Sequence, residues 1–389
     1  MIIVNLNLAN FRIFRSLKLN LAPGVNIFAG GNAQGKTSLI EAIYILAIGK
    51  AFRAENEGEV VSWNTSGNKI GQTVIDASFT SEDESNRVII AYSPTYTSNR
   101  YSTVSSTSVR KEIKVNGIRN SASDLIGFIT AVLFSANDME LVLGPPSYRR
   151  RYMDILLSQS DKEYLSALQN YQRVLQQRNQ LLKLIQQNRG EINELEFWDA
   201  KLSREGSSII CKRFEIVEKI SALSNEILAQ LTSSNEDLTI IYKPSLGSPV
   251  QGAVSESEFL HSLEKARKTD LLRGVTTLGP HRDDLGIIVN GIDMGPFSSR
   301  GQARTLALSM KLAEAKTLET LRGYPPLVLL DDVLSELDED RRNMVLSQTL
   351  KGGQTLITST TLEPFNPNFI SQSNVFTINQ GVIEQSISL

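Results

Sequence analysis

The 389-residue sequence predicts an α/β fold that carries an inserted, mostly helical region. Two observations predict the α/β part. Apolar stretches that suit strands occur towards both ends of the chain, and a strand, a glycine loop and a helix follow one another between residues 25 and 48. A third observation predicts the insertion, because strand patterns fade between about residues 146 and 271 and apolar residues recur there at helical spacing.

The N-terminal part of the chain has the patterns of short strands. Alternating apolar residues predict a half-buried strand with Ile2, Val4 and Leu6 on one face, and Val25–Ala29 is a shorter apolar strand. Residues 70–120 also favour strands, and Asn116-Gly117 there suits a two-residue hairpin turn. The segment Ser93–Ser108 is rich in Ser, Thr and Tyr, so we expect an exposed loop.

After residue 271 the α/β patterns return. A second hairpin turn is expected at Asn290-Gly291, and buried strands are expected at Leu327–Leu330 and Thr355–Ile357. Val375–Ile378 should pair with Val382-Ile383 across a short turn.

The middle of the chain predicts a helical arm. One apolar seam follows a four-three spacing and has Arg178 in one of its slots: Tyr164, Leu168, Tyr171, Leu175, Leu182 and Ile185. A second seam runs between Leu195 and Ile227, and Asn188-Arg189-Gly190 could turn the chain between the two. About 28 helical residues would span roughly 42 Å, which is a short arm. Since α/β parts flank it, we expect one discontinuous domain, residues 1–145 and 272–389, with the arm at residues 146–271.

The composition excludes several classes of protein. Forty Lys and Arg against 42 Asp and Glu give a formal charge of −2, which excludes a histone-like polycation but not a local basic patch. With Cys211 as the single cysteine and only His261 and His281, neither a disulfide within the chain nor a His/Cys zinc site is expected. No run approaches the ~18 apolar residues of a membrane span, and no signal-peptide pattern is seen. We therefore expect a cytoplasmic protein without a membrane partner.

Residues 30–37 match the phosphate-binding pattern G-x-x-x-x-G-K-[ST] in the required context, with a strand before and a helix after. The residues are Gly30, Gly31, Asn32, Ala33, Gln34, Gly35, Lys36 and Thr37, and Ser38 follows them. Glycines let the backbone wrap around phosphates, while the amides and the helix N-terminus supply positive potential. Lys36 would reach the β- and γ-phosphates, and the Thr37 hydroxyl would hold Mg²⁺.

A second element would complete such a site. The apolar strand Leu327–Leu330 ends in Asp331 and Asp332. Asp331 suits a Mg²⁺ ligand, and Asp332 could orient or deprotonate the attacking water. Two acids after a strand can also simply cap a turn, but the phosphate loop favours the functional interpretation. Asp332 is one methylene shorter than a Glu, so we expect slow hydrolysis.

Further downstream, the order of motifs resembles an ABC-type ATPase head. Ser299-Arg300-Gly301-Gln302 precedes an apolar helix expected at Thr305–Leu318, and Ser335-Glu336-Leu337-Asp338 follows the acidic strand. In such heads the S-x-G-Q segment of one subunit faces the ATP bound by the other. The resemblance implies that Ser299, Gly301 and Gln302 bind ATP across a homodimer that forms on ATP. Taken alone, the segment also fits an ordinary helix N-cap.

More specifically, nearly the whole chain resembles the RecF family of bacterial DNA replication and repair proteins, within the ABC-type and SMC-like ATPases. The residues that carry the resemblance are Asn10-Phe11-Arg12, Gly30–Ser38, Glu41-Ala42-Ile43, Phe134–Asp138, Gly144-Pro145, Arg149–Arg151, Asp154, Arg178-Asn179, Trp198-Asp199, Gly279–Asp284, Ser299–Arg304 and Leu330–Asp338. The nucleotide motifs indicate only the ABC class, whereas the GPHRDD run at 279–284 and the arm indicate RecF. The resemblance implies ATP-dependent binding to double-stranded and gapped DNA. It also implies that the mediators RecO and RecR act with the protein to place RecA at gaps.

The chain departs from these patterns at several positions. RecF proteins generally have a Ser near Ala51 and a Pro near Ala136, which should matter little for nucleotide binding. Many ABC ATPases place a His after the acidic strand to sense the γ-phosphate, but Thr358–Thr361 contains none. A hydroxyl could act there instead, and we assign no residue. We expect His281 to be a hydrogen-bonded, buried imidazole rather than a catalytic group.

Several cations could form a surface for DNA phosphates in a dimer: Arg149, Arg150, Arg151, Lys111, Lys114 and Arg119. The alternative is that the charges at the start of the arm pair with Asp154 or Glu140.

Two other function classes remain open. An SMC-type chromosome-structuring protein would need a long coiled coil, for which these seams are short. The ATPase subunit of a transporter is usually more compact between loop and signature, whereas 263 positions separate Lys36 from Ser299 here.

Overall fold

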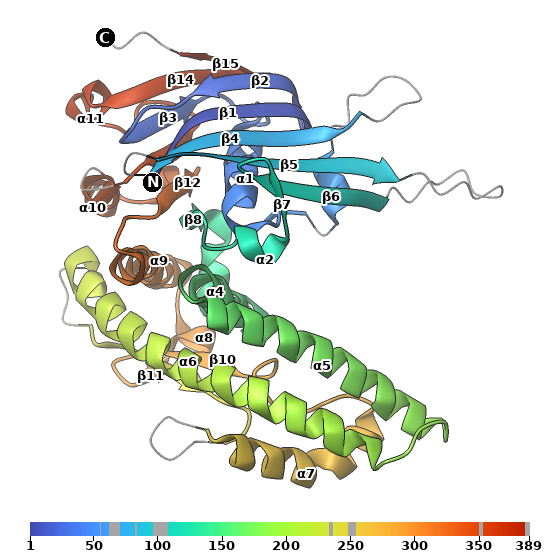
Figure 1. The fold of residues 1–389 in the computed structure, drawn as a ribbon. Helices are drawn as coiled ribbons and strands as arrows, with labels where there is room; N and C mark the ends of the chain where they lie inside the picture. Colours follow the sequence, from blue (N-terminus) through green and yellow to red (C-terminus); the bar gives the residue numbers. More distant parts are fainter. Residues whose placement is uncertain are drawn as a thin grey trace. The chain divides into compact units, whose positions relative to one another are not determined.

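The computed structural model describes residues 1–54, 56–61, 71–81, 84–95, 108–232, 236–247, 254–349 and 353–385. The chain forms two compact units (Figure 1). The first is Met1–Ala136 with Leu318–Leu389, and the second is Asn137–Thr317. The expected division of the chain assigns residues 272–317 to the ATPase head, whereas compactness places them in the second unit. Residues 96–107 of the loop expected at Ser93–Ser108 lie outside the described residues, and its ends belong to strands.

One sheet of the first unit is antiparallel and has the strand order β2-β1-β4-β5-β6-β7. Its strands are β1 (Ile2–Phe11), β2 (Phe14–Asn20), β4 (Thr73–Ser81), β5 (Glu84–Thr95), β6 (Ser108–Val115) and β7 (Ile118–Asn120). The predicted turn Asn116-Gly117 joins β6 to β7, and both of its residues have the positive φ that such hairpins require. The face of β1 that was predicted to be buried is wrong for the first residues of the strand. A register shift between Ile3 and Asn5 buries Ile3 in place of Ile2 and Val4.

The second sheet of this unit has the order β15-β14-β3-β13-β12-β8 and is parallel except for β15. Its strands are β3 (Val25–Ala29), β8 (Ala131–Ser135), β12 (Leu327–Asp331), β13 (Thr355–Ser359), β14 (Ser373–Asn379) and β15 (Val382–Gln385). The strands expected at both ends of the chain are therefore confirmed, including the β14–β15 hairpin. Because parallel strands end at one edge, the residues that follow β3, β12 and β13 meet there.

Helix α1 (Lys36–Ile48) shares one hydrophobic core with both sheets. Leu39, Ile43 and Leu46 of this helix are completely buried, together with Phe79 of the first sheet and Leu329 of the second. The remaining short helices of this unit are η1 (Glu57–Val60), α2 (Ala122–Leu125), η4 (Leu334–Glu336), α10 (Glu339–Thr349) and α11 (Pro367–Ser371). The first turn of α1 is thereby fixed to a rigid core.

The second unit is mostly helical. It contains α3 (Glu140–Leu143), α4 (Pro146–Ser160), α5 (Lys162–Gln186), α6 (Glu194–Thr232), α7 (Glu256–Arg273) and α8 (Met294–Phe297), with most of η2 (Ala136–Met139) at its start and most of α9 (Arg300–Arg322) at its end. Helices α5 and α6 form the predicted hairpin, and Asn188 between them has a φ of 57°. In the described part of the chain, no helix combines the length and apolar character that crossing a bilayer requires.

Helix α6 is longer than predicted. It is one continuous helix of 39 residues, which corresponds to about 58 Å at 1.5 Å per residue. Gly206 lies inside it, and a Cβ at that position would stand 2.1 Å from the Phe259 ring of α7. The glycine thus permits the close approach of α7 without interrupting α6.

A small sheet in the second unit was not predicted as such. It has the order β11-β10-β9, with β9 (Leu238–Lys243), β10 (Asp284–Val289) and β11 (Ile292–Asp293). The turn expected at Asn290-Gly291 joins β10 to β11. Strand β9 lies inside the stretch predicted to be helical. Its six residues alternate between buried and exposed positions, but the run is short and lies next to long helical patterns.

Candidate nucleotide-binding site

The glycine loop connects β3 to α1 at the edge where the parallel strands end. Gly35 has a φ of 112°, and a Cβ there would stand 2.9 Å from Ile13. A Cβ at Gly30 would lie 2.4 Å from the Ile378 carbonyl oxygen, while the Gly30 amide donates to Ser359 O at 3.1 Å. These glycines therefore allow a tight loop that side chains would prevent.

Lys36 lies folded back over this loop. Its Nζ donates to the carbonyl oxygens of Gly30 (2.8 Å) and Gly31 (3.1 Å), and it lies 3.4 Å from Asp332 Oδ2. The side chain is 4% exposed. A phosphate group that enters the loop would meet the Lys36 ammonium, whose present partners are two neutral carbonyl oxygens and, at the longer distance of 3.4 Å, the Asp332 carboxylate.

Asp331 and Thr37, the predicted Mg²⁺ ligands, lie together. The Asp331 carboxylate accepts hydrogen bonds from the side chains of Thr37 and Thr358. Burial raises the pKa of Asp331 above its ordinary value, although these two hydrogen bonds and the charge of Arg53 oppose the shift. A hydroxyl and a carboxylate are hard oxygen ligands of the kind that Mg²⁺ prefers, so these residues fit the ion.

Three features of this site were missed in the sequence. Arg53, in the loop after α1, is close enough to lower the pKa of Asp331. Gln34 is anchored to the β14–β15 turn, since its Oε1 accepts from Gln380 N (2.6 Å) and its carbonyl from Gly381 N (3.1 Å). Thr358 contacts both acids. No local pattern indicates these contacts, because each joins segments that are far apart in the chain.

The Ser299–Gln302 segment belongs to the second unit, and it forms a closed N-cap. Gln302 N donates to Ser299 Oγ at 3.2 Å, and Ser299 N donates to Gln302 Oε1 at 3.0 Å. Both residues are exposed, as is Gly301, at which a Cβ would meet nothing within 4 Å. The ordinary capping interpretation therefore describes this segment, and its exposure leaves it accessible to a ligand.

The cations predicted to meet DNA are divided between the two units. Lys111 of the first unit donates to Gly49 O and pairs with Glu57 at 2.5 Å, while Lys114 is 44% exposed near Glu112. In the second unit Arg149 is buried against Asp284 at 2.6 Å. Its partner is thus neither Asp154 nor Glu140, and its charge and that of Lys111 are already neutralised.

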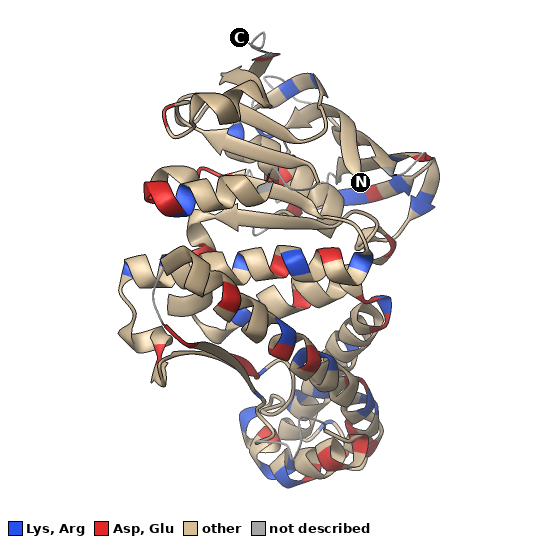
Figure 2. Ribbon diagram, turned by 90° about the vertical axis from the view of Figure 1, so that its left-hand side faces the viewer, with Lys and Arg blue, Asp and Glu red and all other residues tan. Residues whose placement is uncertain are grey.

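The other two arginines at the start of α4 differ from Arg149. Arg150 donates to Asp283 O at 2.9 Å, and Arg151 is exposed. Along the helices of the second unit, Lys and Arg are interspersed with Asp and Glu (Figure 2). Of the predicted cations, Lys114, Arg119 and Arg151 remain the most accessible to a phosphate backbone.

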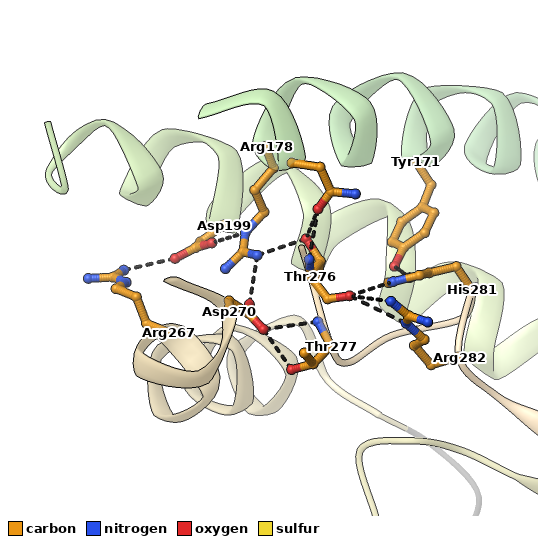
Figure 3. Close-up of polar contacts among 10 residues, drawn as sticks. Tyr171, Arg178, Asp199, Arg267, Asp270, Thr276, Thr277, His281 and Arg282 are labelled. Carbon is orange, nitrogen blue, oxygen red and sulfur yellow. Dashed lines mark hydrogen bonds and ion pairs between the residues drawn. The ribbon is translucent and has the colours of Figure 1, made fainter. Parts of the chain in front are cut away.

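A second cluster of charged residues lies within the second unit, between α5, α6 and α7 (Figure 3). Arg178 is completely buried. Its Nε donates to Asp199 at 2.7 Å, and its Nη1 donates to Asp270 at 2.7 Å and to Thr276 Oγ1 at 2.8 Å. Arg267 donates to the other oxygen of Asp199 at 2.8 Å. The charges of this cluster neutralise one another.

His281 extends this cluster and is bonded through both ring nitrogens. Nε2 lies 3.1 Å from Thr276 O, which can only accept, so Nε2 carries the proton. Nδ1 then accepts from the Tyr171 hydroxyl at 2.7 Å. Burial lowers the pKa of His281 to about 4. As expected, it is a buried imidazole whose hydrogen bonds are satisfied.

Other members of the GPHRDD run are bonded to separate elements. Arg213 of α6 donates to Pro280 O at 2.7 Å, and Ser245 N donates to Asp283 Oδ1 at 2.7 Å. Tyr242 of β9 donates to the same carboxylate of Asp283. The run therefore joins the helical hairpin to the small sheet.

Comparison with known proteins agrees with this geometry. The family model described as "RecF/RecN/SMC N terminal domain" matches residues 2–384. The DNA replication and repair protein RecF of Herpetosiphon aurantiacus is 37% identical over 390 residues, covering 98% of this chain and 99% of that protein. The chain belongs to the RecF family. A second RecF, from Lachnoclostridium phytofermentans, is 35% identical over 99% of this chain and all of its own length.

Solved RecF structures are similar over the whole chain. The recombination mediator protein RecF-ATP in the RecFOR pathway has a TM-score of 0.86 at 32% identity and covers 99% of this chain and 98% of its own. The corresponding RecF-ATPrS structure has a TM-score of 0.85 at 33% identity and the same coverage. An Smc head domain from Pyrococcus furiosus, 15% identical with a TM-score of 0.54, shares the fold and covers 100% of this chain and 96% of its own. The predicted fold class, an α/β P-loop ATPase head of ABC type with a mostly helical arm, is confirmed.

Proposed function

We propose that this RecF-family protein is a Mg²⁺-dependent ATPase of recombinational DNA repair and replication restart, in which ATP controls dimerisation and DNA binding. The observation that carries the proposal is the meeting of Lys36, Thr37, Asp331 and Asp332 at one edge of the parallel sheet. Membership of the RecF family supports the choice of ATP and of DNA. The Smc likeness concerns the fold alone and carries no function.

In the proposed reaction each residue has a separate role. Lys36 leaves its carbonyl partners and neutralises the β- and γ-phosphates, while the amides of residues 30–38 surround them. Thr37 and Asp331 would hold Mg²⁺, whose positive charge would offset the charge that develops on the phosphates. Asp332, 37% exposed, orients the attacking water. We expect hydrolysis to be slow, because the shorter Asp side chain reaches less far than a Glu.

Dimerisation would follow from the exposed Ser299–Gln302 segment. A second copy would offer the N-terminus of its α9, with Ser299, Gly301 and Gln302, to the γ-phosphate. ATP would then join two copies that separate after hydrolysis, which makes the nucleotide a two-state switch.

The DNA-bound state would use the accessible cations, foremost Lys114 and Arg151, on duplex near a single-strand gap. The similar solved protein is described as a recombination mediator of the RecFOR pathway. We therefore propose that RecO and RecR act with this chain to place RecA at gaps. We propose that the protein acts in the cytoplasm.

The proposed DNA binding is tested by fluorescence anisotropy of labelled gapped duplex DNA with ATP, ADP or no nucleotide, at two salt concentrations. We expect tight binding with ATP alone, weakened by salt and lost in Lys36→Ala. Equal binding in all three nucleotide states would contradict the switch.

The dimer is tested by light scattering. Ser299→Arg should leave ATP binding by the monomer intact and prevent the ATP-dependent increase in mass, whereas Lys36→Ala should lose both. If Ser299→Arg removed nucleotide binding first, the contact across the dimer would be the wrong model.

A further inference from the structure

We propose that Thr358 is a positioning residue of the nucleotide site, which holds both acids after β12 in the arrangement that Mg²⁺ and the attacking water require. The inference rests on the proposed function and deepens it, since it assigns a role to a residue outside the nucleotide-binding motifs. In this role Thr358 would act through Asp331 and Asp332 rather than on the phosphates or the water directly.

Its place in the sheet makes this role possible. Strand β13 lies between β3, which leads into the glycine loop, and β12, which leads into the acids. In the parallel register Thr358 stands opposite Asp331 on one side and Phe28 on the other. Thr358 is 1% exposed, so its hydroxyl can bond only to its neighbours in the protein.

The hydroxyl of Thr358 both accepts and donates a hydrogen bond. It accepts a hydrogen bond from Asp332 N at 3.0 Å and lies 3.0 Å from Asp331 Oδ1. A hydroxyl has one proton to donate, and an ionised carboxylate is a stronger acceptor than the Leu330 carbonyl at 3.3 Å. One side chain therefore fixes the carboxylate of the first acid and the backbone of the second.

This double contact has a separate consequence for each acid. Asp331 is held between Thr358 and Thr37, which limits rotation of its carboxylate plane. Asp332 has a φ of 52°, in the left-handed region that non-glycine residues occupy at a cost. The bond from Asp332 N to Thr358 supports that conformation, in which the carboxylate reaches to 3.4 Å from Lys36.

The same strand offers a matched control. Thr355 is also completely buried on β13, but its Oγ1 has no hydrogen-bond partner among the described residues. Thr355→Val and Thr358→Val are the same isosteric change at the same depth, and they differ in whether the lost hydroxyl had partners. Thr358→Ser keeps the hydroxyl and tests for rescue.

The experiment measures the affinity of a fluorescent ATP analogue in EDTA and in saturating Mg²⁺, together with the Mg²⁺ concentration that gives half of the tightening. For Thr358→Val we expect unchanged binding in EDTA and a Mg²⁺ requirement raised by about tenfold, the size of one charge-assisted hydrogen bond. Thr358→Ser should restore the requirement to within about twofold, and Thr355→Val should match the unsubstituted chain. Turnover at saturating Mg²⁺·ATP should also fall in Thr358→Val, because Asp332 loses its anchor.

The possible outcomes separate this inference from the proposed function. If Thr358→Val and Thr355→Val gave the same Mg²⁺ requirement, or if Thr358→Ser failed to rescue it, the positioning role would be refuted while ATP binding stood. If the unsubstituted chain bound the analogue no better in Mg²⁺ than in EDTA, the proposed Mg²⁺·ATP site itself would be wrong.

Discussion

Lys36 and Arg178 are both nearly or completely buried cations, yet their surroundings differ. Lys36 contacts two backbone carbonyls and lies 3.4 Å from Asp332, a carboxylate that is 37% exposed. Arg178 has Asp199 and Asp270 at 2.7 Å, and both of these carboxylates are completely buried. The first cation can exchange its partners for a ligand, whereas the second cannot move without leaving the buried carboxylate of Asp270 uncompensated, since Asp199 alone keeps a second arginine, Arg267.

The difference separates charged residues that are available to a ligand from those that hold the fold. Both Lys36 and Arg178 lie in segments that carry the resemblance to the RecF family, so residue identity alone does not distinguish the two roles. The pair of Arg12 and Glu41 shows why identity is not enough. It lies beside the phosphate loop, yet the carboxylate of buried Glu41 accepts two hydrogen bonds from Arg12, at 2.8 and 3.0 Å, as in a pair that holds the fold. The surroundings of each charge, rather than its presence, indicate its role.

The largest effect is expected from Arg178→Met. The substitution keeps the apolar stem but leaves Asp270 buried without its arginine, which should lower the free energy of unfolding by about 3–5 kcal/mol. Chemical denaturation followed by circular dichroism measures the loss, and hydrogen exchange in α5 and α6 should locate it in the second unit. Arg173→Met, at an exposed position of the same helix, should change stability by less than about 0.5 kcal/mol. If Arg178→Met lowered the free energy of unfolding no more than Arg173→Met does, Arg178 would not be a cation that the fold requires.

The sequence indicated the site far better than it indicated this cluster. The phosphate loop is contiguous and the acids directly follow an apolar strand, so both could be placed from local patterns. Arg178 was visible as a charge inside an apolar seam, but its partners lie 21 and 92 positions away. Only the packing of α5, α6 and α7 brings them together.

The errors in the predicted fold have similar causes. The bulge that buries Ile3 comes from pairing with β4, about 70 residues along the chain, and cannot be read from the alternation of β1 itself. Strand β9 is stabilised by β10, which begins at residue 284. Tertiary pairing decided both cases against the local pattern.

An effect of intermediate size on the free energy of unfolding is expected when the pH is lowered, because His281 is buried. The folded-state pKa of His281, about 4, lies below its ordinary value of 6.5, so between these pH values the unfolded chain binds more protons and stability falls as pH is lowered. Desolvation is the main cause, and Arg282 and Arg150 add to it, while Thr276 O and Asp270 oppose it. The contribution is present above about pH 6.5 and should amount to about 2 kcal/mol between pH 7 and 4.5.

Denaturation of His281→Asn and His261→Asn at several pH values isolates that contribution. His261→Asn is the control for the loss of a histidine, since the imidazole of His261 is 64% exposed on α7. His281→Asn should be less stable at pH 7 and should lose less stability on acidification. Parallel slopes for the two variants would show that His281 does not titrate as its burial requires.

The smallest effect on stability is expected from Lys36→Met, although this residue is as buried as many in the core. Its loss leaves Asp332 partly hydrated and two loop carbonyls able to meet water, so the free energy of unfolding should change by less than about 1 kcal/mol. Saturating Mg²⁺·ATP sharpens the test. A ligand at 100 times its dissociation constant stabilises the unsubstituted chain by about 2.7 kcal/mol, and the variant should gain almost none of this. A loss of several kcal/mol without nucleotide would instead place Lys36 with Arg178, as a cation that the fold itself requires.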